Sequence, residues 1–364
     1  MSNVEDRYKI ITQDTVELLT SEDLRARLAE KAELKGYIGF EPSGLMHIAQ
    51  GIICAKKIRD LNDAGVKMVV YMADWHAYIN DKLGADIERL QTCGKYMEEV
   101  FLALGVDPSK TEFVYASKLL DTIDFWEKVL RIAKASSLHR VRRAMTIMGR
   151  KGGADSDSSK FFYPAMQVAD IFQLEVDIAY GGMDQRKAHV LAREVAEKLG
   201  YPKPIALHTP LLMGLQGSGR MDYSEAEVAV DEEDARLIDM KMSKSSPDSA
   251  VYFHDSPDDI KRKLKKAYCP EGDIRENPIM EMCKYIVFPN FNSVKVERPE
   301  KFGGDMEFDR YDILEESFEG MQLHPLDLKM AVAHYIDELV KPVRDYFDKN
   351  PKNLEAVKKF EITK

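Results

Sequence analysis

The chain has few cysteines and no long apolar run. None of its four cysteines forms a CxxC pair, so neither a zinc site nor a disulfide framework is indicated. No uncharged apolar stretch approaches the roughly 18 residues that a membrane-spanning helix needs. The polar start Met1–Lys9 lacks the apolar core of a signal peptide. We therefore expect a protein of the reducing cytoplasm, without a membrane span.

The sequence also lacks two common nucleotide-binding signatures and any excess of positive charge. We find no GxGxxG after a predicted strand and no GxxxxGK[ST], which argues against a dinucleotide-dependent dehydrogenase and a P-loop ATPase. The formal net charge of -10 argues against indiscriminate nucleic-acid binding, because phosphate affinity depends on local Lys and Arg. An RNA partner would need basic patches, although such charge runs are usually solvated faces. The candidate patches are Arg140, Arg142, Arg143, Arg150 and Lys151, then Arg186 and Lys187, then Lys261–Lys266.

Helical and strand patterns alternate along the first two thirds of the chain. A strand over 36–40, a helix over 48–61 and a strand over 66–73 form a βαβ unit. Further elements follow: a helix near 86–104, a strand at 113–116, helices through 148 and a strand near 176–179. This alternation predicts an α/β fold with a doubly wound parallel sheet, whose ligands bind beyond the carboxyl ends of the strands.

The length of 364 residues and the later composition predict two domains. A Gly, Ser and Asp cluster at 151–159 indicates a mobile surface loop between helical segments. The chain is glycine-rich and then acidic from 214 to 239, and beyond 255 its patterns are helical with little strand signal. We place the domain boundary near Val251, ahead of a smaller all-α C-terminal domain.

A histidine stands where the first helix of the βαβ unit begins. The segment His47-Ile48-Ala49-Gln50 follows the predicted strand and a tight loop. Free backbone N–H groups and the positive end of the helix dipole attract anions at a helix N-terminus. His47 therefore suits the phosphates of ATP, although a plain helix cap would use the same residues.

Two lysines spaced by three lie in a polar segment after the predicted sheet. The segment reads Lys241-Met242-Ser243-Lys244-Ser245. Lysines on a flexible loop can close on a leaving pyrophosphate as charge develops in the transition state. The spacing indicates a phosphate-contacting loop, and the alternative is a solvated loop of lysine and serine.

Three polar side chains share one face of an otherwise apolar predicted helix. Tyr163, Gln167 and Asp170 stand at i, i+4 and i+7, among Met, Val, Ala, Ile and Phe residues. The segment Gly181–Gln185 follows at the end of a predicted strand. Buried polar groups need partners, so this face indicates a ligand site. An exposed polar stripe on an amphipathic helix is the alternative.

Together the three motifs resemble tyrosyl-tRNA synthetases of the archaeal and eukaryotic kind, which are class I aminoacyl-tRNA synthetases. The resemblance extends from Tyr37 to about Val343 and includes Ala73–Tyr78, Lys266–Pro270 and Arg298–Gly304. It implies an enzyme that activates L-tyrosine with ATP to tyrosyl-adenylate and transfers tyrosine to the 3′ end of tRNA(Tyr).

The resemblance also implies a domain plan. A Rossmann-like catalytic domain would span residues 1–250 and carry a helical connective insertion at about 118–160. A helical anticodon-binding domain would span 251–364. The family resemblance further implies a homodimer.

The same resemblance implies which residues bind the substrate tyrosine. Tyr37 and Asp170 would hydrogen-bond the phenol hydroxyl of the substrate. Phenylalanine would leave both groups buried and unpaired, which costs free energy. His76 also suits a purely structural buried role. The residues implied for the α-amino group are Tyr163, Gln167 and Gln185, and those near the ring are Tyr71 and His76.

For ATP the resemblance implies that the substrate carboxylate attacks the α-phosphorus in line, without an enzyme nucleophile. Positioning and stabilisation of phosphate charge would then supply the catalysis. Mg²⁺ would arrive on the ATP phosphates, so no protein metal site is expected. The implied catalytic residues are His47, Lys241 and Lys244. The wider ATP set is Glu41, Gly44, His47, Gln50, Lys241, Met242, Ser243, Lys244 and Ser245.

For tRNA the resemblance implies two separate contact regions. An aromatic ring can stack on an unpaired base, and a carboxylate can accept hydrogen bonds from a guanine edge. A core aromatic is the alternative for Phe302. The acceptor-end residues would be Arg143, Arg186 and Lys187. The anticodon residues would be Phe302, His324 and Asp327.

The sequence departs from the family at the nucleotide motif. Where the usual motif reads His-Ile-Gly-His, this chain has Ala49 and Gln50, so an amide replaces the second histidine. Two alternative functions stay open: a tryptophan-tRNA ligase with the same fold, and a catalytically silent RNA-binding paralogue. The pair of Tyr37 and Asp170 argues against the first, and the intact 241–245 segment argues against the second. The acidic segment 222–239 has no assigned role.

Overall fold

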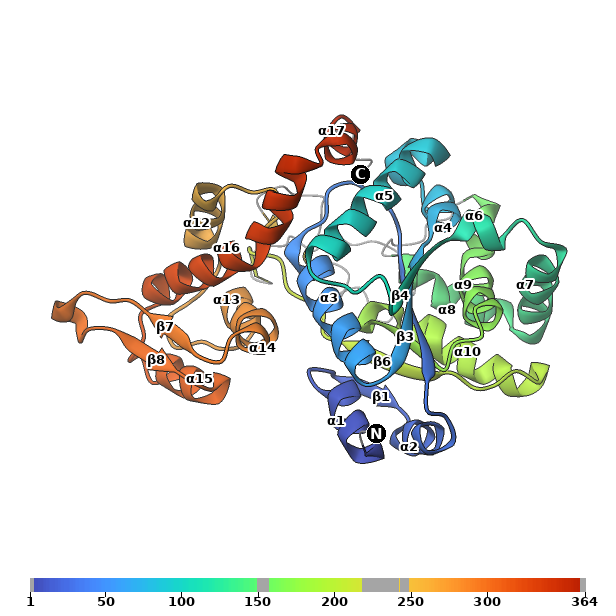
Figure 1. The fold of residues 1–364 in the computed structure, drawn as a ribbon, viewed down its shortest axis with the longest axis horizontal. Coiled ribbons are helices and arrows are strands. Elements are labelled where there is room, and N and C mark those ends of the chain that lie inside the picture. The colour runs from blue at the N-terminus through green and yellow to red at the C-terminus, as the bar shows by residue number, and fades with distance from the viewer. Residues whose placement is uncertain (1–2, 149–156, 218–241, 243–248, 361–364) are drawn as a thin grey trace.

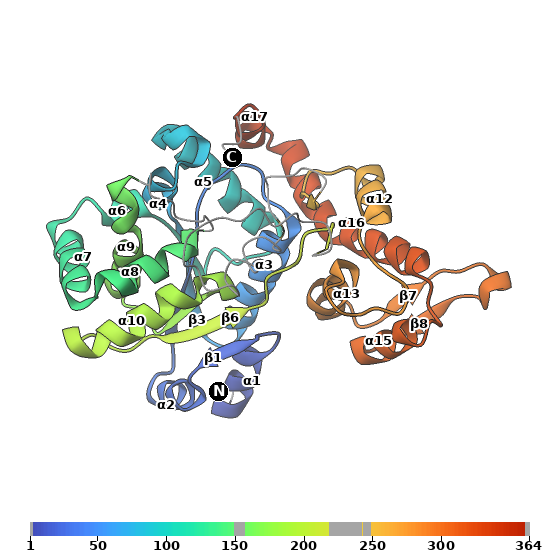
Figure 2. The ribbon, with the colours of Figure 1, turned by 180° about the vertical axis from the view of Figure 1, so that it is seen from behind.

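Two parts of the molecule lie side by side in both views of the fold (Figure 1, Figure 2). The computed structural model describes residues 3–148, 157–217, 242 and 249–360. One part is built around a twisted sheet with helices on both faces, and the other is mostly helical and follows from α12 onward (Figure 1). The mixed α/β architecture with a helical C-terminal region confirms the predicted fold class.

The six-stranded sheet has the order β1-β6-β5-β2-β3-β4. All neighbouring strands are parallel except β1, which is antiparallel to β6 at one edge. β2 lies in the middle, between β3 and β5, so the chain order reverses at this strand. The structure confirms the predicted doubly wound sheet and adds β1 and β6, which were not predicted. The strands are β1 Glu17–Leu19, β2 Leu34–Phe40, β3 Val66–Met72, β4 Thr111–Tyr115, β5 Ile178–Gly182 and β6 Ile205–Thr209.

Local sequence explains where the main helices begin and end. α5 begins after Asp86, whose carboxylate accepts hydrogen bonds from the N–H groups of Glu88 and Arg89. α3 ends before Gly65, whose φ of +76° is the left-handed conformation that glycine adopts without strain. The helices of this part are α1 Val4–Thr12, α2 Ser21–Glu30, α3 Ile48–Asp63, α4 Asp74–Ile79, α5 Ile87–Ala103, α6 Ala116–Leu119, α7 Ile123–Ala135, α8 Leu138–Ala144, α9 Tyr163–Gln173 and α10 Arg186–Leu199. Short 3-10 turns are η1 Lys82–Ala85, η2 Met145–Met148, η3 Ser158–Phe161 and η4 Met183–Gln185.

Alternate residues of the central strands enter two different hydrophobic cores. Ile38 and Val70 lie in the core that contains side chains of α3 and α5. Tyr37, Val69 and Tyr71 lie in the core that contains side chains of α7, α9 and α10. This is the two-residue period of a strand with both faces covered. Tyr37 and Tyr71 consequently lie on the same side of the sheet as α9.

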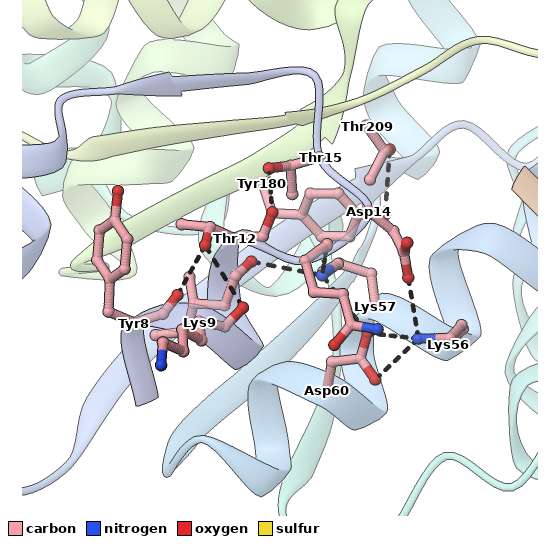
Figure 3. A network of polar contacts seen from close by, with 12 residues as sticks. Tyr8, Lys9, Thr12, Asp14, Thr15, Lys56, Lys57, Asp60, Tyr180 and Thr209 are labelled. Carbon is pink, nitrogen blue, oxygen red and sulfur yellow. Dashed lines mark hydrogen bonds and ion pairs between the residues drawn. The ribbon is translucent and has the colours of Figure 1, made fainter. Parts of the chain in front are cut away.

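A polar cluster anchors the N-terminal segment onto α3 (Figure 3). Lys57 is almost fully buried and donates a hydrogen bond to the backbone carbonyl of Gln13. The ammonium group of Lys56 lies 3.2 Å from Asp14 and 3.0 Å from Asp60. Burial lowers the pKa of Lys57, as expected for a cation removed from water. Removing one partner of such a buried cluster is costly, so these contacts fix α1 against the helix that begins after His47.

The C-terminal part is helical apart from one small antiparallel sheet. β7 and β8 pair from Val294 with Phe308 to Val296 with Met306. Sequence patterns did not predict this pair, because a strand of three residues is too short to show a period of two. The elements are α12 Pro257–Lys266, α13 Pro278–Met282, the π-helix η7 Cys283–Val287, α14 Phe288–Asn290, β7 Val294–Val296, η8 Glu300–Phe302, β8 Met306–Phe308, α15 Tyr311–Glu319, α16 Pro325–Lys349 and α17 Lys352–Lys358.

One hydrophobic core continues from the sheet into the C-terminal helices. It joins side chains of α3 and α5 to those of α12 and α16. Asn353 of α17 donates a 2.8 Å hydrogen bond to Glu99 of α5. The domain boundary near Val251 stays a prediction. Residues 151–156 of the predicted loop and the acidic segment 222–239 lie outside the described residues.

All four cysteines are free thiols, and three of them are buried. None of the helices described here is both long enough and apolar enough to cross a membrane.

Candidate active site

The polar face of α9 lies against the centre of the sheet. Tyr163, Gln167 and Asp170 are all buried, which rules out the exposed polar stripe that the sequence left open. Tyr37 of β2 is buried in the same region, in register with Val69 of β3 and Ala179 of β5. β2 is the strand at which the chain order reverses, the place where open α/β sheets bind ligands.

Asp170 receives two partners from the strand and helix opposite α9. Tyr71 donates a 2.6 Å hydrogen bond to Oδ1, and Nε2 of His76 lies 3.1 Å from Oδ2. Burial works to lower the pKa of His76, but the charge and contact of Asp170, with Glu41 and Asp74 further off, raise it above its ordinary value. Oδ2 receives no hydrogen bond of acceptable geometry within the described part of the chain. Asp170 therefore keeps one buried acceptor atom for another donor.

A second buried acceptor belongs to Gln167. Its amide nitrogen donates a 3.0 Å hydrogen bond to Oε1 of Gln185, from η4. Gln185 in turn donates to the carbonyl of Ile147 at 3.4 Å. The carbonyl oxygen Oε1 of Gln167 is buried and has no hydrogen-bond partner among residues 3–148, 157–217, 242 and 249–360. The amide oxygen of Gln167 is thus an acceptor, beside the polar face of α9, that a ligand could use.

Glu41 connects this pocket to the loop after β2. It accepts a 2.6 Å hydrogen bond from the hydroxyl of Tyr163 and further bonds of 3.1 and 2.9 Å from Asn80. Lys82 lies 3.8 Å from its carboxylate. Asn80, fully buried, also donates to the carbonyl of Met148. Asn80 was not predicted from the sequence; it lies two positions beyond the Ala73–Tyr78 segment of the family resemblance.

The predicted nucleotide loop crosses from β2 to the start of α3. Gly44 has a φ of +106°, which glycine adopts without strain. His47 precedes the first residue of α3, but its side chain does not cap the helix. His47 thus holds the N-cap position of α3 without a capping hydrogen bond from its side chain, and its contact with ATP stays a prediction. Gln50 lies in the first turn, and its Oε1 is buried without a hydrogen-bond partner among the described residues.

The predicted lysine loop is described only at Met242. This residue is buried, and its N–H donates a 2.7 Å hydrogen bond to the carbonyl of Leu212. Lys241, Ser243, Lys244 and Ser245 lie outside the described residues.

The residues predicted to contact tRNA lie on two distant parts of the fold. Arg143 is exposed on α8, and Arg186 and Lys187 begin α10, where Arg186 pairs with Glu17 at 2.9 Å. Phe302 is 60% exposed at the end of η8, which excludes the core-aromatic alternative.

Two of the residues predicted to contact the anticodon, His324 and Asp327, lie at the start of α16. His324 caps this helix by accepting a hydrogen bond from the N–H of Leu326, and Asp327 lies in its first turn. Arg298 donates to the carbonyls of Gly304 and Gln322, so it ties the turn after Phe302 to the segment before His324.

Two further buried polar groups near the site were not predicted from the sequence. Asp74 is fully buried and accepts hydrogen bonds from the N–H of Ser117 and the amide of Gln91. Tyr96 of α5 pairs with His254, which lies 158 positions away. A contact between such distant positions leaves no periodic signal in the sequence.

Comparisons with known proteins agree with this geometry. A family model described as class I tRNA synthetases (W and Y) matches residues 29–240 and 237–341. A tyrosine-tRNA ligase of Sulfurisphaera tokodaii is 51% identical over 344 residues, covering 94% of this chain and 92% of the relative. Among solved structures, tyrosyl-tRNA synthetase of Pyrococcus horikoshii, complexed with L-tyrosine, gives a TM-score of 0.90 at 44% identity, covering 98% of this chain and 100% of that one.

A second solved structure gives the same result. The tyrosyl-tRNA synthetase of Aeropyrum pernix has a TM-score of 0.85 at 42% identity and covers 98% of both chains. These matches extend over nearly the whole length, and they include both the sheet and the C-terminal helices. The chain therefore belongs to the class I tRNA synthetase family of the tryptophan and tyrosine enzymes, and within it to the tyrosyl-tRNA synthetases.

Proposed function

We propose that this chain activates L-tyrosine with ATP and transfers it to the 3′ end of tRNA(Tyr), with the pocket beside α9 holding the amino acid. One observation supports the pocket above all others. Oε1 of Gln167 is a buried acceptor without a hydrogen-bond partner among the described residues, and Oδ2 of Asp170 is a buried acceptor that receives no well-aligned hydrogen bond there, with Nε2 of His76 3.1 Å away. Buried acceptors of this kind are rare without a function, because each costs free energy until a donor arrives.

Tyrosine carries a donor for each of these acceptors. Its phenol O–H suits the carboxylate of Asp170, and its ammonium group suits the amide oxygen of Gln167. Gln185 and Tyr163 complete the proposed ammonium subsite. Phenylalanine lacks the first donor, and its ring would cover Oδ2 without satisfying it.

The charges around the phenol subsite favour a neutral phenol. The raised pKa of His76 favours an imidazolium beside Asp170, which balances the buried carboxylate. Burial raises the pKa of Tyr37, so its hydroxyl keeps the proton that it can donate to the phenol oxygen. In this proposal Asp170 accepts from the phenol and Tyr37 donates to it.

ATP would bind over the loop between β2 and α3. We assign it to Glu41, Gly44, His47 and Gln50, together with the lysines and serines of 241–245. The buried amide oxygen of Gln50 supports a contact with a donor such as a ribose hydroxyl. His47, Lys241 and Lys244 would stabilise the charge on the leaving phosphates. Mg²⁺ would enter bound to ATP, as is usual for this ion.

The tRNA would span both parts of the molecule. Arg143, Arg186 and Lys187 would hold its acceptor end. Phe302, His324 and Asp327 would meet the anticodon, and the exposure of Phe302 supports stacking on an unpaired base.

A homodimer would use α7. Ile123, Trp126 and Leu130 lie one helical turn apart on the same face and are 88%, 40% and 64% exposed. Large apolar side chains gathered on one exposed face mark interaction sites, and a second copy of the chain fits the family resemblance. The free thiols and the tRNA substrate support a cytoplasmic location.

The test is amino-acid-dependent ATP–pyrophosphate exchange with tyrosine, tryptophan and phenylalanine in parallel. The proposal predicts exchange with tyrosine alone. Exchange with tryptophan would favour the tryptophan-tRNA ligase, and no exchange with any of the three would favour the silent RNA-binding paralogue.

A further inference from the structure

Side chains of α5, rather than regular secondary structure, hold the backbone just before His47. The N–H of Gly44 donates a 3.2 Å hydrogen bond to the sulfur of Cys93. The N–H of Met46 donates a 3.3 Å hydrogen bond to the hydroxyl of Tyr96, one turn further along α5. Cys93 and Tyr96 are both fully buried.

The carbonyl of Met46 is held from the opposite side. It accepts a hydrogen bond of 3.3 Å from the N–H of Phe253, and the N–H of Ile48 donates to the carbonyl of Val251 at 2.9 Å. Phe253 also packs against Gly51 so closely that a Cβ there would lie 2.2 Å from its ring. Both backbone groups of Met46 are therefore used, one by α5 and one by the segment 251–254.

A single hydrogen bond connects these two supports. The hydroxyl of Tyr96 lies 2.9 Å from Nε2 of His254, the residue after Phe253. Burial, with the charges of Lys358 and Arg344, lowers the pKa of His254 to about 4, so its ring is neutral near pH 7. The Tyr96 oxygen accepts a hydrogen bond from the N–H of Met46. The Tyr96 hydroxyl therefore donates its own hydrogen bond to Nε2 of His254.

Aromatic packing keeps this bond in place. The ring of Phe347, from the last turns of α16, lies 5.4 Å from the Tyr96 ring and 5.1 Å from the His254 ring, between centroids. Met46, Tyr96, His254 and Phe253 thus form a closed ring of contacts around the backbone that leads into His47. In the sequence, the segment 251–254 follows the predicted lysine loop.

We propose that Tyr96 and His254 are positioning residues for the reaction, which fix the backbone of residues 44–47 so that His47 meets the ATP phosphates. The inference rests on the proposed function. Neither residue belongs to the tyrosine pocket, because Tyr96 lies in the core of α3 and α5 whereas Tyr37 lies in the core of α9. Loss of the Tyr96 hydroxyl should therefore disturb ATP chemistry and leave tyrosine binding intact.

The test uses Tyr96→Phe with Tyr115→Phe as the matched control. Tyr115 also packs against α5, at Gly94, and its buried hydroxyl has no hydrogen-bond partner among the described residues. The first measurement is hydrogen–deuterium exchange of the peptide covering residues 44–51, which needs no activity. Tyr96→Phe should speed its exchange at least about tenfold relative to wild type and to Tyr115→Phe. Unchanged exchange would overturn the proposal whatever the enzyme's activity is.

The second measurement is tyrosine-dependent pyrophosphate exchange. Tyr96→Phe should lower kcat at least about tenfold, because a small misplacement of a catalytic group is enough for such a loss. The KM for tyrosine should stay within about twofold of wild type, and Tyr115→Phe should match wild type. Equal losses in the two variants, or a matching loss of tyrosine affinity, would mean that the role of Tyr96 is only structural.

His254 provides the rescue test. His254→Gln keeps an acceptor at the position of Nε2, so it should retain more activity and more protection of residues 44–51 than His254→Leu. Equal behaviour of the two variants would contradict the role of the hydrogen bond. Failure of the wild type to exchange pyrophosphate would contradict the proposed function. The protection of residues 44–51 from hydrogen–deuterium exchange would still decide whether Tyr96 and His254 position the loop.

Discussion

The hydroxyl of Tyr71 donates a 2.6 Å hydrogen bond to Oδ1 of Asp170, whose other oxygen, Oδ2, lies 3.1 Å from Nε2 of His76. Asp170→Asn keeps the shape of the side chain but removes its charge. It should lower kcat/KM for tyrosine in pyrophosphate exchange by about tenfold to a hundredfold, because hydrogen bonds to charged groups contribute roughly 1.5–3 kcal/mol. Exchange with phenylalanine should stay at background in both proteins.

Tyr71→Phe is the control for this prediction. It keeps the ring and the carboxylate and removes only the donor to Oδ1, so its effect on tyrosine should be smaller than that of Asp170→Asn. If the Asn variant distinguishes tyrosine from phenylalanine as well as wild type does, Asp170 does not bind the phenol.

The two ends of α16 should behave differently towards tRNA. Asp327→Ala, in the first turn, should lower kcat/KM for tRNA charging at least about tenfold, since a base contact typically contributes about 1–3 kcal/mol. Pyrophosphate exchange, which needs no tRNA, should be unchanged. Asp348→Ala removes the same charge from an exposed position near the other end and should leave both activities intact. An equal fall in pyrophosphate exchange would remove Asp327 from the anticodon site.

The apolar face of α7 predicts the oligomeric state. Leu130→Asp places a charge on this face and should weaken a homodimer at least about tenfold, because the dimer would bury an unpaired carboxylate in place of a leucine. Light scattering after size exclusion, at several concentrations, measures the change. Arg131→Asp, on the neighbouring half-exposed position, should remain dimeric. A wild type that is monomeric at every concentration would contradict the proposed dimer.

Buried histidines should make the fold sensitive to acid. The pKa of His254 is lowered from 6.5 to about 4, so between these values the unfolded chain binds a proton that the folded chain does not. The contribution of His254 to the free energy of unfolding should therefore be fully present above about pH 6.5. This contribution should fall by up to about 3 kcal/mol as the pH drops to 4. His189 and His208, whose pKa values burial also lowers, act in the same direction, while the raised pKa of His76 acts in the opposite one.

Urea unfolding at pH 7, 6 and 5 measures this dependence. His254→Gln should reduce the slope of stability against pH by up to about 1.4 kcal/mol per pH unit, the contribution of one proton. Parallel curves for the variant and the wild type would show that His254 does not titrate in this range.

Long apolar patterns predicted the centre of the fold well. The strand predicted over 66–73 is β3 at Val66–Met72, and the helix predicted over 48–61 is α3 at Ile48–Asp63. Both are long enough to show their period and end at recognisable breakers. β6 was missed although all five of its residues are buried, since a buried histidine at position 208 interrupts the apolar run.

The site was predictable only where its residues share one element. The spacing of Tyr163, Gln167 and Asp170 indicated a single polar face on α9, and burial confirms that the face points inward. The bond between Tyr163 and Glu41 joins positions 122 residues apart, and no local pattern reports such a contact. Contacts between such distant positions depend on tertiary packing, so they could be identified only from the structure.

The most direct test is a crystal structure of the chain with L-tyrosine. We expect the phenol oxygen to lie within about 3 Å of Asp170 and of the Tyr37 hydroxyl, with the ammonium group at Gln167 and Gln185. Tyrosine bound in the reverse direction, or bound away from Asp170 and Gln167, would contradict the proposed pocket.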